Sequence, residues 1–183
     1  MNQIAPQTLM RDLLASYPGA QRVLFKNYHL GGCSQCAFQP TDTLAGLCTQ
    51  NGLDVAEVTN KILSGHEQDA KTFIEPKELA AALERGEPIK LVDVRSKSEF
   101  EATRIEGSIG LAQPVMQEIM AHWPRDQHFV IIDHQGKQSL DAAAYFQGHS
   151  FVNVRCLRGG LDAWSREIDP TIRRYRLETA DQK

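Results

Sequence analysis

The sequence lacks the features of a membrane or exported protein. No apolar run approaches the roughly 20 residues that a membrane-spanning helix needs, so no membrane association is expected. The first residues, 1–6, contain no basic segment followed by an apolar stretch, and a signal peptide is therefore not predicted. These absences make the cytoplasm the expected location.

The sequence also lacks an excess of charge of either sign. Its 183 residues carry a net charge of −3. Residues 1–70 hold four Lys or Arg against six Asp or Glu, and residues 71–183 hold 16 against 17. Neither part has the clustered basic charge that nucleic-acid binding requires, so no nucleic-acid partner is expected. The hydrophobic content of 42% is sufficient for buried cores.

Cysteine is scarce, with four residues in the whole chain. In a cytoplasmic protein this number argues against structural disulfides and favours redox, metal-binding or buried roles. Three of the four, Cys33, Cys36 and Cys48, fall in the first 70 residues, whereas Cys156 lies near the end.

Residues 1–64 are predicted to form a small all-α domain. Apolar residues recur at helical spacing, and turn or capping residues divide them into separate helices. The predicted helices cover residues 8–17, 20–28, 41–51 and 54–64. The polar, unpatterned residues 65–72 are predicted to be a linker.

Residues 73–170 alternate helical and strand patterns and are followed by a tail, residues 171–183. Strands are predicted at residues 90–94, 129–132 and 151–156. Helices are predicted at residues 76–85, 114–123, 140–146 and 161–168. Strands separated by helices indicate an α/β fold with a parallel sheet and helices on both faces.

Two motifs in this part resemble rhodanese-like domains. The run Leu91-Val92-Asp93-Val94-Arg95, with Glu99-Phe100 and residues 105–109, is similar to their opening signature, and residues 154–164 to their closing signature. The resemblance covers residues 73–170 and implies a rhodanese-like sheet. In active members of this family, the loop after the fourth strand begins with a cysteine that carries a persulfide, held by the N–H groups of the loop. In related phosphatases, an arginine near the end of the loop helps to hold the anion.

The corresponding loop follows the strand at residues 129–132. Its N–H groups are expected to converge at a helix N-terminus, which favours anion binding. It consists of Asp133, His134, Gln135, Gly136, Lys137, Gln138 and Ser139. The resemblance places Asp133 at the cysteine position and Gln138 at the arginine position. Since a carboxylate cannot form a persulfide and repels anions, we do not expect sulfur transfer at this degenerate loop.

Asp133 itself has two interpretations. Its carboxylate could accept hydrogen bonds from the loop N–H groups and cap the following helix. Alternatively, it could act with His134 as a ligand or a catalytic carboxylate.

The second candidate site is the C-x-x-C pair Cys33 and Cys36, directly after Gly31-Gly32. This region resembles small redox-disulfide domains of the type associated with hybrid-cluster proteins. The pair could be a reversible dithiol, part of a zinc or iron–sulfur site completed by Cys48 or His29, or two inert thiols. Cys48 and Cys156 both lie in apolar patterns and are predicted to be packing residues.

These observations leave three hypotheses open. In the first hypothesis, the chain is a non-catalytic rhodanese-like protein with a cysteine-pair domain in sulfur, thiol-redox or iron–sulfur metabolism. Alternatively, it is a metal or iron–sulfur protein, or a sulfurtransferase that accepts sulfur on Cys33 or Cys36. A protein partner from sulfur or iron–sulfur metabolism is expected. The sequence does not specify the oligomeric state or require a cofactor, although zinc or an iron–sulfur cluster would suit the cysteines.

Overall fold

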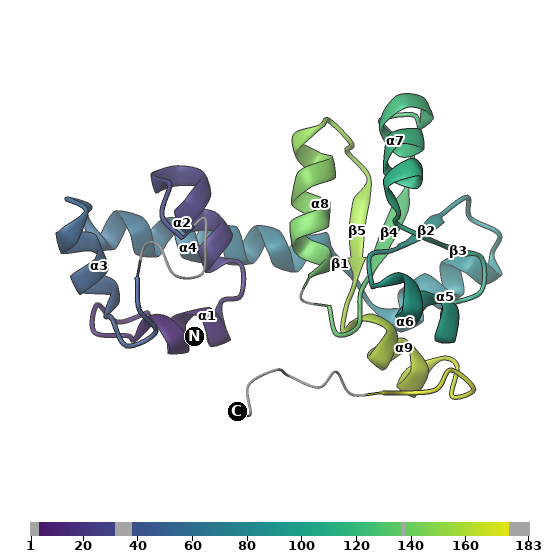
Figure 1. Cartoon of the computed structure of the whole chain (residues 1–183), viewed down its shortest axis with the longest axis horizontal. Coiled ribbons are helices and arrows are strands. Elements are labelled where there is room, and N and C mark those ends of the chain that lie inside the picture. The colour runs from purple at the N-terminus through teal and green to yellow at the C-terminus, as the bar shows by residue number, and fades with distance from the viewer. Residues whose placement is uncertain (1–3, 32–37, 137, 176–183) are drawn as a thin grey trace. The chain divides into compact units, whose positions relative to one another are not determined.

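The computed structural model describes residues 4–31, 38–136 and 138–175 (Figure 1). The chain divides into two compact units, residues 1–71 and residues 72–183. Within the described residues, no helix combines the length and the apolar character needed to cross a bilayer.

The first unit is helical. Its helices are α1 (Met10–Ser16), α2 (Ala20–Tyr28), α3 (Leu44–Gln50) and α4 (Val55–Thr72). The hydroxyl of Thr43 caps α3 by accepting a 3.0 Å hydrogen bond from the N–H of Gly46. Apolar residues from all four helices form one buried core, which includes Met10, Leu13, Leu24, Leu44, Leu47, Cys48, Val58 and Ile62.

Residues 65–72 are the second half of α4 and not the linker that we predicted. Gly65 lies inside the helix and does not end it. At this position α4 passes close to α2, and a Cβ on Gly65 would be 2.5 Å from Cγ2 of Val23. Further along, Arg22 pairs with Asp69 at 2.6 Å. This half of α4 contacts α2 through the close approach at Gly65 and the ion pair of Asp69. Neither contact produces an apolar pattern in the sequence, so the pattern did not predict this part of the helix.

The second unit is an α/β domain with a five-stranded sheet in which every strand pair is parallel (Figure 1). The strands are β1 (Phe73–Ile74), β2 (Lys90–Asp93), β3 (Ser108–Gly110), β4 (Phe129–Ile132) and β5 (Val154–Leu157), in the order β1-β5-β4-β2-β3. The helices are α5 (Pro76–Glu84), α6 (Lys97–Ala102), α7 (Gln113–His122), α8 (Ser139–Gly148) and α9 (Gly160–Glu167). The predicted fold class is confirmed.

The central strand β4 is buried on both faces. Val130 and Ile132 belong to a core with residues of α5 and α9, whereas Phe129 and Ile131 belong to a core with residues of α7 and α8. Because successive side chains of a strand point to opposite faces, this division places α5 and α9 on one face and α7 and α8 on the other. The predicted helical cover on both faces is therefore present.

Three elements were not predicted. Helix α6 follows a capping box, in which the Ser96 side chain accepts from the N–H of Glu99 and the Glu99 side chain accepts from the N–H of Ser96. The Ser-x-x-Glu spacing was visible in the sequence and is the signal that we missed. Strands β1 and β3 have only two and three residues, too few for any periodicity.

The strand order fixes where a ligand site can form. From β2 the chain continues to the neighbouring strand β3, whereas from β4 it continues to β5 on the opposite side. The paired carboxyl ends of β2 and β4, at Asp93 and Ile132, are thus a topological switch point, where open α/β sheets bind ligands. Asp133 directly follows this end of β4.

Candidate functional site

Asp133 is the first residue of the loop that connects β4 to α8, and the N–H groups of the loop surround its side chain. The residue is 1% exposed. One carboxylate oxygen, Oδ1, accepts a hydrogen bond from the N–H of Gly136. The other, Oδ2, accepts from the N–H groups of Gln138 at 2.6 Å and Ser139 at 3.1 Å. The loop N–H groups converge as predicted, and the carboxylate of Asp133 satisfies three of them.

Three glycines allow the loop to pack tightly against the turn that begins α9. A Cβ on Gly136 would lie 2.6 Å from the backbone nitrogen of Gly159, and one on Gly160 would lie 2.5 Å from the carbonyl oxygen of Asp133. All three glycines have positive φ angles, between 60° and 79°. The N–H groups of Leu161 and Asp162 donate to the carbonyls of Asp133 and His134 at 2.8 and 3.1 Å. Asp133, His134 and Gly136 are therefore packed closely against the start of α9.

His134 is buried beside this centre. Its side chain is 7% exposed, and neither ring nitrogen has a hydrogen-bond partner among the described residues. The hydroxyl of Ser139 is likewise buried and unpartnered within that part of the chain. Gln135 and Gln138 are exposed. Lys137 lies outside the described residues.

A buried ion pair lies at the end of β2. The guanidinium of Arg95 donates from Nε to Oδ1 of Asp93 at 3.0 Å and from Nη2 to Oδ2 at 2.7 Å, and the two side chains are 1% and 0% exposed. Burial alone would lower the pKa of Arg95, but the hydrogen bonds to Asp93 and Tyr175 outweigh it, and the pKa is raised. Arg95 stays charged and is fixed in position, with Nη2 also donating to the carbonyl of Thr103 at 2.6 Å.

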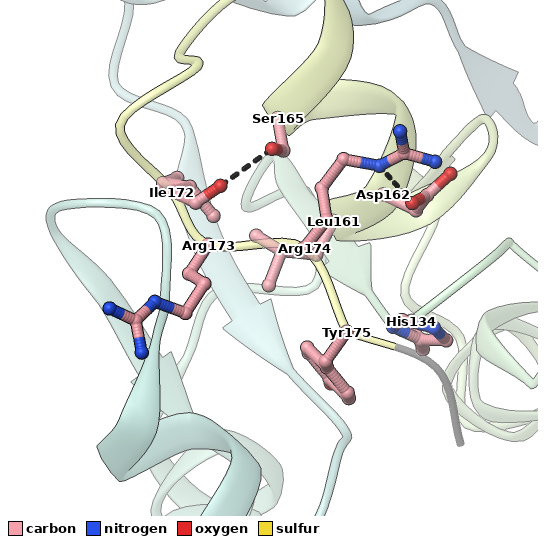
Figure 2. Close-up of a pocket in the computed structure, with 8 residues that line it drawn as sticks. All are labelled: His134, Leu161, Asp162, Ser165, Ile172, Arg173, Arg174 and Tyr175. Carbon is pink, nitrogen blue, oxygen red and sulfur yellow. Dashed lines mark hydrogen bonds and ion pairs between the residues drawn. The ribbon is translucent and has the colours of Figure 1, made fainter. Parts of the chain in front are cut away.

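The C-terminal segment covers the site, which the sequence did not predict. Of the predicted tail, residues 171–175 are described and pack against the loop and α9 (Figure 2). Ile172 is buried, and its carbonyl accepts a 2.6 Å hydrogen bond from the hydroxyl of Ser165. The ring of Tyr175 lies on that of His134, with 4.3 Å between centroids. Tyr175 is the functional candidate that sequence reasoning missed, because nothing in the local pattern distinguishes it.

The phenol of Tyr175 joins the ion pair to α6. Its oxygen accepts from Nη1 of Arg95 at 2.9 Å, and its hydroxyl donates to Oε1 of Glu99 at 2.7 Å. Burial and the hydrogen bond to Glu99 raise the pKa of Tyr175 to about 12, against the opposing effect of Arg95. Burial would raise the pKa of Glu99, but hydrogen bonds from Ser96 and Tyr175 outweigh it and lower the pKa.

An open cleft of about 350 Å³ borders Tyr175 and is lined by Gln135, Asp162, Arg174 and Tyr175. Nε of Arg174 pairs with Oδ1 of Asp162 at 2.7 Å. This hydrogen bond is the main reason why the pKa of Asp162 lies below its usual value. The lining of the cleft therefore includes the Asp162 carboxylate, which Arg174 keeps in its charged form.

The candidates of the helical unit are only partly described. Cys33 and Cys36 lie outside the described residues, so their predicted roles are untested. Cys48 is fully buried in the helical core, and burial raises the pKa of its thiol. His29 is exposed and ends α2 in a left-handed conformation. In the ranges 4–31, 38–136 and 138–175, no three His, Cys, Asp or Glu side chains are placed to hold a metal ion.

Comparisons with known proteins point to one family. The family model of the rhodanese-like domain matches residues 75–167. A sulfurtransferase of Allochromatium vinosum is 30% identical over 99 residues, which cover 54% of this chain and 92% of that protein. The thiosulfate sulfurtransferase GlpE of Pseudomonas savastanoi is 34% identical over 89 residues, 49% of this chain and 83% of the relative.

A longer alignment links the chain to a larger protein. The adenylyltransferase and sulfurtransferase UBA4 of Candida albicans is 24% identical over 174 residues, which cover 88% of this chain but 38% of that protein. The chain spans about two fifths of the length of the first curated relatives that it matches. The family model covers just over half of the chain and falls within the unit that carries the parallel sheet. The chain therefore belongs to the rhodanese-like family.

Proposed function

We propose that the rhodanese-like unit binds a protein partner without transferring sulfur at its loop, and that Cys33 and Cys36 form a reversible dithiol that carries the chemistry. The observation that supports this most strongly is the carboxylate of Asp133 among the N–H groups of Gly136, Gln138 and Ser139. The loop supplies its own anion. The setting is sulfur or thiol-redox metabolism, in line with the relatives named as sulfurtransferases.

Sulfur transfer requires a nucleophile that can form and release a sulfur–sulfur bond. A thiolate does so because sulfur is soft and polarizable, whereas a carboxylate oxygen does not. The carboxylate of Asp133 is also engaged by three hydrogen bonds and 1% exposed. We therefore assign Asp133 a structural role, in which it organises the loop and the start of α8.

The proposed dithiol is tested by differential alkylation and mass spectrometry of the full chain. In protein equilibrated with air, Cys33 and Cys36 are expected to react with an alkylating reagent only after reduction. Cys48 and Cys156, both buried, serve as internal controls that react after denaturation. Full labelling of Cys33 and Cys36 without a reductant would contradict the dithiol.

Zinc or an iron–sulfur cluster at Cys33 and Cys36 is the competing proposal. Cys48 is a poor third ligand because it faces the helical core, and so a protein ligand would have to come from His29 or a second chain. Metal analysis of protein purified without oxygen separates the two proposals. Stoichiometric zinc or iron that is lost in Cys33→Ser would favour the metal site, and metal-free protein would favour the dithiol.

A further inference from the structure

The side chains beneath Tyr175 are held in place mainly by other residues. Arg95 is fixed by Asp93 and by the carbonyl of Thr103. Glu99 is fixed by Ser96, whose N–H and hydroxyl donate to Oε2 of Glu99 at 3.0 and 2.5 Å. The fold thus holds a hydrogen-bond donor and an acceptor in place around one phenol oxygen.

His134 forms the third wall of this surface and has unused hydrogen-bonding capacity. A buried polar atom without a partner costs about 1–3 kcal/mol, yet both ring nitrogens of His134 are unpartnered among the described residues. The ring of Tyr175 covers this imidazole and satisfies neither nitrogen through any described contact. A buried, unpartnered imidazole at a switch point indicates a ligand site that Tyr175 fills incompletely.

Beyond Ile172, the cover is held mainly by the phenol of Tyr175, through its hydrogen bonds with Arg95 and Glu99. Ile172 and its hydrogen bond to Ser165 anchor the base of the segment. Arg173 and Arg174 are exposed, and Arg174 pairs with Asp162, whose side chain is 18% exposed. Tyr175 also packs against the core that contains Ile172, so residues 173–175 leave the surface when another group takes the place of the phenol.

We propose that the surface formed by His134, Arg95 and Glu99 is a docking site for a tyrosine side chain of a partner protein, and that Tyr175 occupies it when the partner is absent. The proposal rests on the proposed function, in which this unit binds a partner. The paired donor and acceptor at the phenol oxygen select tyrosine over phenylalanine. The charged carboxylate of Asp162 selects a basic residue directly before the tyrosine, which is the place that Arg174 takes here.

The adjoining cleft of about 350 Å³ provides room for further residues of the incoming segment. Gln135 lines it, and its exposed amide can donate to and accept from a peptide backbone. The partner segment is therefore a short extended peptide with an Arg-Tyr or Lys-Tyr pair. Tyr175 belongs to the same chain and therefore has a high effective concentration at the site. A partner segment displaces it by binding more tightly or by being present at a higher concentration.

The test is a binding titration of the full-length chain with a fluorescent peptide that has the sequence of residues 171–175. Tyr175→Ala removes the internal competitor and is expected to bind the peptide at least about tenfold more tightly than the wild type, which still binds measurably. A peptide with phenylalanine in place of tyrosine is expected to bind about tenfold more weakly. Tyr145→Ala is the matched control, because Tyr145 is an exposed tyrosine that also lies against a histidine, His149, and this change should leave binding at the wild-type value.

Three results would overturn the docking site. These are no binding to Tyr175→Ala, binding to Tyr175→Ala with none to the wild type, and equal binding of the tyrosine and phenylalanine peptides. No binding to Tyr175→Ala would mean that the surface does not bind the peptide. Binding to Tyr175→Ala alone would mean that the segment is a fixed part of the fold. Equal binding of the two peptides would mean that the phenol is not recognised. None of these results affects the alkylation pattern of Cys33 and Cys36, so the proposed dithiol is judged separately.

Discussion

The N–H of Gln138 donates a 2.6 Å hydrogen bond to Oδ2 of Asp133, five residues earlier in the chain. With the bonds from Gly136 and Ser139, it turns the loop into a closed anion site whose anion is covalently part of the protein. The N–H groups of the loop thus surround the carboxylate of Asp133, which fills the place of an external anion.

Replacing Asp133 should destabilise the second unit. Asp133→Ala leaves three loop N–H groups without their acceptor, and we expect a loss of about 2–4 kcal/mol in the free energy of unfolding. Both tryptophans, Trp123 and Trp164, lie in this unit, so denaturant unfolding followed by tryptophan fluorescence reports on it selectively. Added sulfate should stabilise Asp133→Ala more than the wild type, since it can enter the vacated site. The exposed Asp126→Ala is the control, and an equal effect of the two changes would argue against the role of Asp133.

The contact between the loop and α9 can be tested with two glycine substitutions. Gly160→Ala adds backbone strain and brings a Cβ to 2.5 Å from the carbonyl oxygen of Asp133. Gly107→Ala adds a similar strain at φ +77°, with nothing within 4 Å of the new Cβ. We expect about 1–2 kcal/mol of destabilisation for Gly107→Ala and at least about 3 kcal/mol for Gly160→Ala, measured by denaturant unfolding. Similar losses for both would mean that the close approach is unimportant.

The buried pair of Asp93 and Arg95 should be sensitive to the loss of either partner. Asp93→Asn leaves the Arg95 charge buried without its counter-ion, and a loss of about 3–5 kcal/mol is expected. The exposed pair of Arg85 and Glu87 provides the comparison, and Arg85→Ala should cost less than about 1 kcal/mol. Thermal unfolding of both variants measures the difference. Comparable losses would show that the buried pair contributes no more than a surface pair.

Tyr175 should ionise late in an alkaline titration. Its pKa in the folded protein is about 12, against 10.0 for an unperturbed tyrosine. Since the folded value is the higher one, the stability that Tyr175 contributes is complete below pH 10 and is lost as the pH rises through about 12. Ultraviolet absorbance of tyrosinate should show a late step that disappears in Tyr175→Phe and persists in Tyr145→Phe. A titration without this late step would contradict the hydrogen bonds of the phenol.

The sequence predicted those parts of the fold that local patterns encode. The apolar run of β4 and the glycines around Gly159 identified the sheet and its loop, because burial and tight turns restrict which residues fit. The convergence of the loop N–H groups followed from the strand–loop–helix order, whereas their hydrogen bonds to Asp133 were one of two interpretations that the sequence allowed. The capping box of α6 was also encoded locally, at Ser96 and Glu99, and could have been found.

Other parts depend on contacts between distant residues and have no local signature. The second half of α4 is held in part by Arg22, which pairs with Asp69 across 47 positions. Tyr175 meets Arg95 across 80 positions and Glu99 across 76. A tyrosine in a polar tail gives no indication that its hydroxyl will reach a buried ion pair, so the cover over His134 became visible only in the structure.

The central claim is that the loop of Asp133 does not transfer sulfur and that Cys33 and Cys36 carry the thiol chemistry. The most direct measurement is thiocyanate formation from thiosulfate and cyanide by the wild type, by Asp133→Cys and by the double variant Cys33→Ser with Cys36→Ser. We predict no thiocyanate above background from the wild type and measurable thiocyanate from Asp133→Cys. Thiocyanate from the wild type that persists undiminished in the double variant would place sulfur transfer outside the cysteine pair and contradict the account.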